Sequence, residues 1–178
     1  MTKAVHHCHC GNHAWAELTR GYITLISPEF AQAVGLWKWK ANASGRGWYA
    51  ARNHTTRINS ERRTIVIWLH RTILTLPHGL FVDHINRNTL DNRLENLRAA
   101  SASANSINRR CRTGTSSKYR GVSRRGGKWH ALITINGVRK PLGVFETEIE
   151  AALAYDREAK VLHGEFAVLN FKEHKDAA

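Results

Sequence analysis

Three side chains between positions 82 and 108 could act together: Asp83, His84 and Asn105. Carboxylate and amide oxygens are hard ligands of the kind that Mg²⁺ or Mn²⁺ prefers. A histidine beside such an ion is placed to take a proton from water. The alternative is that an Asp-His pair at a strand end is structural and that the Asn-rich stretch is an ordinary turn. The set as a whole favours a metal-assisted site with His84 as general base.

The same stretch predicts the elements that would position these side chains. An apolar run at 80–82 is typical of a short strand, and the polar residues at 85–95 are typical of a loop. A second short strand is expected at 96–100 and a helix from about Ala104. The predicted order is therefore a ββα unit, in which the three side chains would face one another across a small cleft.

The segments VDHIN, LDNR and ENLR, in this order, resemble the HNH endonuclease motif in the form common to phage and intron homing endonucleases. The resemblance implies a ββα-metal (His-Me finger) unit, with His84 as general base and Asp83 as a metal ligand. The central Asn of the motif falls on Asn96, which would orient the loop. The third position falls on Asn105, a second ligand for Mg²⁺. The implied activity is site-specific cleavage of DNA by one-metal chemistry.

The composition indicates a polyanionic partner. The 178 residues include 27 Lys or Arg against 14 acidic residues, a formal net charge of +13. Between Glu95 and Glu146 there is no carboxylate but there are eleven basic residues, which predicts a phosphate-binding surface for double-stranded DNA. No apolar run approaches the roughly 20 residues of a membrane span. The first ten residues lack a signal-peptide pattern, so we expect the protein in the cytoplasm of a bacterial or phage-infected cell. We also expect a monomer.

The C-terminal third predicts a separate domain. Three short β runs at 119–124, 128–134 and 139–145 precede a helix with a Thr147/Glu150 capping box. The segments YRGV, LGVF, EAALAYD and LNF resemble the plant Apetala-two/ethylene-response-factor DNA-binding domain. This resemblance implies a three-stranded antiparallel sheet, packed on one helix, that lies in the major groove.

The expected DNA contacts come from this domain and from the basic residues before it. Arg120 and Arg139 match contact positions of the plant family, whereas Trp129 could equally be a core residue. The full expected set is Arg98, Arg109, Arg110, Arg120, Arg124, Arg125, Lys128, Trp129, Arg139 and Lys140.

The N-terminal sequence HHCHCGNH suggests a second metal site. Cys8, Cys10 and His13 could be three ligands of a structural zinc knuckle, with His6 or His7 as the fourth. The alternative is a flexible His-rich arm, because the spacing is tighter than in common zinc motifs.

The expected class is therefore α+β, with a small α/β scaffold packed behind the nuclease unit. His70, within the scaffold, either faces the site or is simply packed. Two functions stay open: a homing-type DNA endonuclease, or a DNA-binding transcriptional regulator without cleavage activity. The predicted segments are an arm at 1–20, scaffold and nuclease at 21–112 (core 80–108), a linker at 113–117, a DNA-binding domain at 118–172 and a tail at 173–178.

Overall fold

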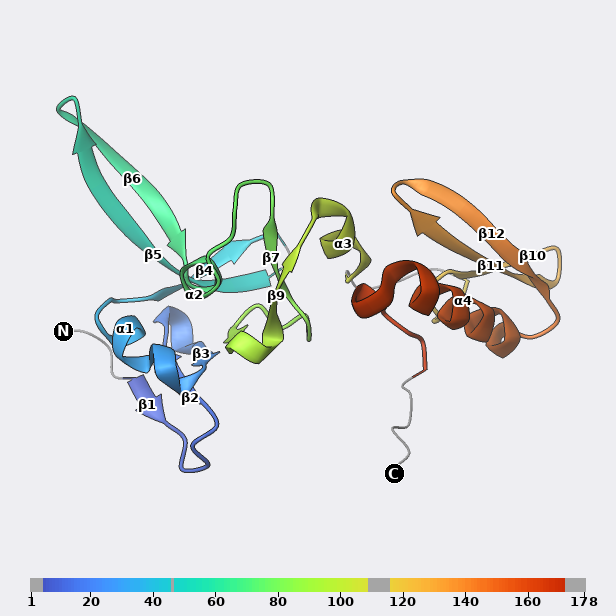
Figure 1. Cartoon of the computed structure of the whole chain (residues 1–178), viewed down its shortest axis with the longest axis horizontal. Helices are drawn as coiled ribbons and strands as arrows, with labels where there is room; N and C mark the ends of the chain where they lie inside the picture. Colours follow the sequence, from blue (N-terminus) through green and yellow to red (C-terminus); the bar gives the residue numbers. More distant parts are fainter. Residues whose placement is uncertain (1–4, 46, 109–115, 172–178) are drawn as a thin grey trace. The chain divides into compact units, whose positions relative to one another are not determined.

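The chain divides into two units, Met1–Ser101 and Ala102–Ala178 (Figure 1). A computed structural model describes residues 5–45, 47–108 and 116–171. The chain is mixed α+β, with several small sheets and few helices, as the sequence predicts. The division falls between the second strand and the helix of the predicted ββα unit, so helix α3 (Ala102–Ile107) belongs to the second unit. Most of the predicted linker at 113–117, and the tail at 173–178, lie outside the described residues.

The first unit contains a four-stranded sheet in the order β1-β2-β3-β8, a three-stranded sheet β4-β5-β6 and a pair β7-β9. All neighbours are antiparallel except β3 and β8. Two short helices complete it. The bounds are β1 Val5–His7, β2 Ala14–Glu17, β3 Ile23–Ile26, α1 Ala31–Gly35, β4 Lys40–Ser44, β5 Gly47–Ile58, β6 Glu61–Trp68, α2 Leu69–Ile73, β7 Phe81–His84, β8 Asp91–Asn92 and β9 Leu97–Ala100.

The core of the first unit draws on its N-terminal strands. Ala14, Ala16 and Leu18 are buried beside Ile26 and Leu69, so much of the predicted arm at 1–20 is part of the folded unit. Burying such apolar side chains is the main favourable contribution to folding. Strand β8 lies in the loop of the predicted nuclease motif and pairs with β3. The β2–β3 hairpin therefore supports this loop.

Strands β5 and β6 form a long hairpin that extends away from the rest of the first unit (Figure 1). The sequence predicts these strands as part of a packed scaffold, and only the base of the hairpin fits that prediction. Most of the described side chains from Asn53 to Val66 are exposed, including the apolar Ile65. The apolar run at the end of β6 therefore does not mark a fully buried strand.

The second unit is a three-stranded antiparallel sheet, β10-β11-β12, with helix α4 packed on it, as predicted. Its strands are Val122–Arg125, Lys128–Ile135 and Val138–Phe145, and α4 spans Glu148–His163. The predicted capping box between Thr147 and Glu150 is present. Small side chains let the helix approach the sheet closely, because Ala151, Ala152 and Ala159 are fully buried.

Two contacts hold other segments of the second unit against helix α4. Gly121 has a φ of +72°, and a Cβ there would lie only 2.1 Å from the Tyr155 ring, so no larger residue fits. The buried Asp156 carboxylate accepts hydrogen bonds from the backbone N–H groups of Asn170 and Phe171. None of the helices in the described part of the chain has the length and apolar character needed to cross a membrane.

Candidate active site

Asp83 and His84 are the last two residues of β7 and pair with Arg98 and Leu97 of β9. Both side chains are buried, each about 5% exposed. The Arg98 side chain donates to Asp83 Oδ2 through Nε at 2.9 Å, and its Nη2 lies 2.9 Å from the same oxygen. This pairing offsets the cost of burying both charges. Arg98, a predicted DNA contact, thus has a partner within the chain, and its role toward DNA stays a prediction.

His84 is held by a chain of hydrogen bonds from the scaffold. Its Nε2 lies 3.3 Å from Asn92 Oδ1, and Asn92 Nδ2 donates to Thr24 Oγ1 at 2.7 Å. The Thr24 hydroxyl in turn donates to the Leu90 carbonyl at 2.9 Å. Thr24 and Asn92 are completely buried, so neither of these two side chains can exchange its partner for water.

The direction of this chain fixes the tautomer of His84. Thr24 uses its hydrogen toward Leu90 and therefore accepts from the Asn92 amide nitrogen. The Asn92 oxygen must then face His84, and an oxygen can only accept. Nε2 accordingly carries the hydrogen, and the basic lone pair of the neutral ring lies on Nδ1. The geometry assigns Nδ1 as the nitrogen that would take a proton.

The polar loop after β7 is braced by its own side chains. Asp91 accepts from Arg93 Nε and Nη2, each at 2.8 Å, and from Asn86 Nδ2 at 2.8 Å. Burial alone would raise the pKa of Asp91, but the hydrogen bonds and charge of Arg93 lower it overall. Asn96 bonds the backbone at both ends of the loop, accepting from Asn86 N and donating to Asp91 O. These bonds run from the Asn96 side chain to the loop backbone, and the role of Asn96 in a reaction stays a prediction.

An aromatic wall stands beside His84. The rings of His70 and Tyr49 lie 5.3 and 6.2 Å from the His84 ring, and Trp68 lies 5.6 Å from Tyr49. Of the two alternatives for His70, the structure shows a buried ring that also contacts His84. Burial, followed by the charges of His84 and Arg71, lowers the pKa of His70 to about 3. His70 is therefore neutral at physiological pH and adds no charge next to His84.

Burial lowers the pKa of His84 as well, although the Asn92 hydrogen bond and the charges of Asp83 and Asp91 oppose this shift. The lowered pKa keeps the imidazole neutral, and so able to accept a proton, to lower pH than an ordinary histidine. A buried, neutral and oriented histidine next to a carboxylate is a suitable general base.

The donor chemistry at this site fits a hard divalent cation in part. The Asp83 carboxylate is a suitable ligand, but Arg98 occupies its Oδ2, so a metal would bind through the other oxygen or displace the guanidinium. Asn105, the second predicted ligand, lies on α3 in the second unit. Its role in metal binding stays a prediction.

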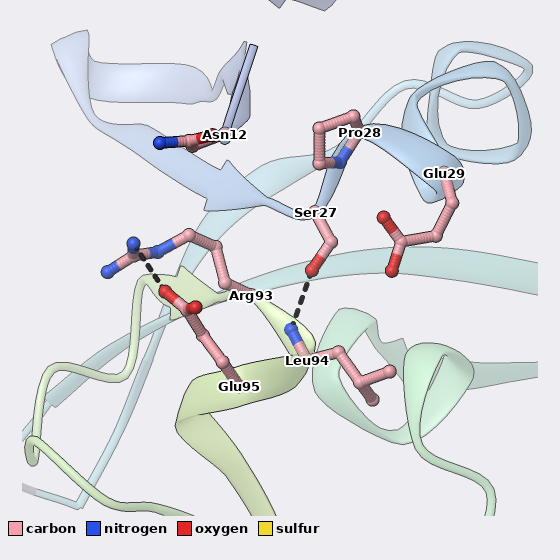
Figure 2. Close-up of a pocket in the computed structure, with 7 residues that line it drawn as sticks. All are labelled: Asn12, Ser27, Pro28, Glu29, Arg93, Leu94 and Glu95. Atoms are coloured by element: carbon pink, nitrogen blue, oxygen red, sulfur yellow. Dashed lines mark hydrogen bonds and ion pairs between the residues drawn. The ribbon is translucent and has the colours of Figure 1, made fainter. Parts of the chain in front are cut away.

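A hollow on the first unit lies apart from these residues (Figure 2). Several of its polar groups are already engaged within the chain, because the Ser27 hydroxyl accepts from Leu94 N at 2.8 Å and Arg93 pairs with Glu95 at 2.7 Å. Neither Asp83 nor His84 lines it. We therefore assign no chemistry to this hollow.

The N-terminal Cys/His cluster is brought together in the turn between β1 and β2. The ligand atoms of Cys8, Cys10 and His13 lie within 4.8 Å of one another. Cys10 Sγ is 3.5 Å from His13 Nδ1, and Cys8 N donates to the His13 carbonyl at 3.0 Å. Two thiols and an imidazole are the donor types of structural zinc sites, so the cluster fits this ion with a fourth ligand still to be identified.

The register of the second sheet separates the predicted DNA contacts into two groups. Because side chains alternate along a strand, Arg125, Lys128 and Arg139 lie on the face opposite α4. Lys140 lies on the helix side and pairs with Glu158 of α4. Trp129 packs against the core, with the Arg124 guanidinium 5.6 Å from its ring centroid.

The other predicted contacts are placed differently. Arg120 is half-buried, and its Nη1 donates to the Ile107 carbonyl at the end of α3 at 3.1 Å. Arg109 and Arg110 lie outside the described residues. A structural role of Arg120 thus exists beside its predicted role toward DNA.

Comparisons with known proteins match this part of the chain to a known family. A family model described as HNH endonuclease matches residues 65–107, which include β7, β8 and β9. Protein 3.8 of Escherichia phage T7 is 31% identical over 108 residues, which are 60% of this chain and 88% of that protein. The chain belongs to the HNH endonuclease family. An uncharacterised HNH endonuclease of Acanthamoeba polyphaga mimivirus is 38% identical over 109 residues, 57% of this chain and 56% of that protein.

The second unit of this HNH protein has different relatives. The dehydration-responsive element-binding protein 2C of Arabidopsis thaliana is 52% identical over 58 residues, 31% of this chain but only 17% of that protein. The chain thus spans about half the length of the mimiviral relative and a small part of the plant one.

Sequence reasoning missed two residues of the HNH site. Asn92 lies within the LDNR motif, so a signal for it was present, but the motif does not say that its amide faces His84. Thr24 lies 68 residues away from Asn92 in an unremarkable strand and carried no signal.

Replacing Thr24 by Val tests whether the hydrogen-bond chain positions His84. The Asn92 amide would lose its acceptor, so we expect destabilisation of about 1–3 kcal/mol. Cleavage of duplex DNA under single-turnover conditions should slow by roughly 10- to 100-fold, as when partners that orient a functional histidine are removed. Thr24→Ser keeps the hydroxyl and should behave like the wild type. A folded Thr24→Val protein that cuts at the wild-type rate would refute the positioning role.

Elemental analysis tests the Cys/His cluster. The purified protein should contain close to one zinc per chain, and Cys8→Ser should lose it, with a lower melting temperature, because metal binding contributes directly to folding. Cys111→Ser changes the third cysteine and should retain the metal. A wild-type protein that is folded without zinc would contradict the site.

Proposed function

We propose that this chain is a site-specific DNA endonuclease of the homing type, acting in the cytoplasm of a bacterial or phage-infected cell. The observation that carries the proposal is the buried, tautomer-fixed His84 beside Asp83 on β7. The net charge of +13 suits a polyanionic substrate.

In the proposed reaction, His84 Nδ1 removes a proton from the attacking water. The resulting imidazolium keeps its Nε2–H bonded to Asn92, and the nearby carboxylates of Asp83 and Asp91 favour its positive charge. Asp83 and Asn105 would hold Mg²⁺ or Mn²⁺, which would stabilise the charge that develops on the scissile phosphate and the leaving oxygen. Asn96 keeps the loop in place through its two backbone hydrogen bonds. One such centre in a monomer favours the cutting of a single strand.

The second unit is proposed to be an Apetala-two-like DNA-binding domain. Its support is the sheet-and-helix fold together with the similarity to a plant protein whose name describes element binding. In this proposal the face opposite α4, with Arg125, Lys128 and Arg139, lies against the duplex. The same similarity also favours the second candidate function, a DNA-binding regulator that does not cut.

Replacing His84 by Ala separates the two functions. Cleavage should fall by about 10²–10⁴-fold, the usual contribution of a general base, while DNA affinity changes little. The assay is nicking of supercoiled plasmid with Mg²⁺, beside a binding titration in EDTA. His78→Ala is the control, because His78 is an exposed histidine of the same unit. A wild-type protein that binds DNA and never nicks it would support the regulator instead.

The pH dependence of the wild-type rate follows from the same residue. The base must be neutral, so the rate should rise as pH passes upward through the pKa of His84. Since burial lowers that pKa, the midpoint of the single-turnover rate profile should lie below the ordinary value of about 6.5.

Two neighbouring cations on β12 test which face of the second sheet binds DNA. Arg139→Ala should weaken binding and reduce the salt dependence of log K by about 0.9, as for one lost phosphate contact. Lys140→Ala is the matched control, because Lys140 faces α4 and pairs with Glu158. Anisotropy titrations of a labelled duplex at several salt concentrations give both slopes. Equal losses in the two variants would argue against the assigned face.

A further inference from the structure

The β5–β6 hairpin is more exposed than the folding of the first unit requires. Beyond its base, the described side chains on both of its faces meet solvent, and Figure 1 shows it extending from the body. Ile65 and Val66 are 53% and 42% exposed. A two-stranded ribbon that buries so little gains little stability from its own length.

The charge arrangement of the ribbon opposes its own folding. Arg57 and Arg62 are directly paired across the strands. Like charges placed directly opposite each other destabilise a strand pair. Glu61, the acidic residue at the tip, pairs with Arg63, and alternation places both on the other face. The Arg57–Arg62 pair thus creates a local positive charge that an anionic partner would relieve.

The face that carries this pair is continuous with the active site. Tyr49, Asn53, Thr55 and Arg57 alternate onto one face of β5, and their partners on β6 include Thr64 and Arg62. The Thr55 and Thr64 hydroxyls lie 3.0 Å apart on it. At its base are Tyr49 and Trp68, and the Tyr49 ring lies 6.2 Å from that of His84. One surface therefore runs from the proposed base to the arginines.

The base of the ribbon is also held in direction. On its other face, the Arg52 guanidinium lies 4.0 Å from the Trp37 ring centroid and 5.8 Å from that of Trp39.

The length of the ribbon follows from its strand pairing. From the Ala51–Trp68 pair to the Ile58–Glu61 pair there are seven residue steps. At about 3.3 Å per residue the ribbon reaches roughly 23 Å, the length of about seven base pairs.

We propose that the β5–β6 hairpin is a DNA-binding ribbon that lies in the major groove beside the cleavage position, with its Arg57–Arg62 face against the duplex. The inference rests on the proposed nuclease function and adds a second binding surface to it. The major groove is wide enough for a two-stranded ribbon. Charge complementarity selects the partner, because the paired arginines leave this face with positive charge only among its described residues.

The test measures binding of the full chain to a mixed-sequence duplex of about 40 base pairs, which is several times longer than the ribbon. EDTA is present to prevent cleavage. The Arg57→Ala/Arg62→Ala variant should bind at least about tenfold more weakly at about 0.15 M salt, and its salt slope should fall by about 1.8, for two lost phosphate contacts. Its melting temperature should stay the same or rise, because a repulsive pair has been removed. A purely structural role would predict the opposite change in stability.

The matched control removes two exposed cations elsewhere, Lys38→Ala and Arg157→Ala. This variant should bind like the wild type. A second variant joins His54 to Ile65, which are paired across the strands, by an Asn-Gly turn and so removes the outer ribbon. It should fold cooperatively and show the same loss of affinity. Methylating guanine N7 of the probe, which alters the major groove, should weaken the wild type more than either ribbon variant.

The outcomes separate this inference from the proposed function. If the wild type binds and nicks DNA but the arginine variant equals its control, the ribbon proposal fails and the nuclease proposal stands. The ribbon proposal fails in the same way if the arginine variant only aggregates, since the charges would then serve to protect exposed strand edges. An equal methylation effect on wild type and variants would overturn the groove assignment. If the wild type binds no duplex, both proposals fail.

Discussion

The site of this protein depends on one buried hydrogen-bond relay, from the Leu90 carbonyl through Thr24 and Asn92 to His84. Toward each neighbour, every group in the relay can act only as a donor or only as an acceptor, so its hydrogen bonds all run in one direction. The parallel pairing of β3 with β8 brings Thr24 to the loop, and the Leu25 N–H also donates to the Leu90 carbonyl. The N-terminal sheet is therefore part of the site, because its Thr24 determines which imidazole nitrogen of His84 is basic.

The surroundings of the relay reinforce the same state. His70 and Tyr49 keep water from one side of the His84 ring, and neutral His70 brings no competing charge. The two nearby carboxylates are each paired with an arginine. Asp83 pairs with Arg98 and Asp91 with Arg93, so neither is buried as an uncompensated charge. The site combines a wall of rings with paired charges, and together they hold the His84 ring, the proposed base, in one orientation.

The sequence predicted features that arise from neighbouring residues. The β7 and β9 strands, the β10–β12 sheet and the α4 capping box follow from short patterns, and the structure has all of them. Features that depend on distant pairing were not predictable. The role of Thr24 arises from a contact across 68 residues, and the positions of Trp129 and Lys140 depend on strand register. The exposure of Ile65 was missed because an apolar strand gives the same pattern whether or not a partner layer covers it.

The position of α3 has a consequence for domain exchange by recombination between related proteins. The helix that carries Asn105 belongs to the second unit, and Arg120 and Asn136 of that unit bond to its residues. A recombination event that replaced the second unit at the boundary of compact structure would also replace Asn105, the residue predicted to complete the nuclease motif. If the second unit recognises DNA as proposed, a new target preference would then be acquired only together with a new residue at this position. A chimera should accordingly be joined after Ile107, with the Arg120 contact preserved, and not at the apparent boundary after Ser101.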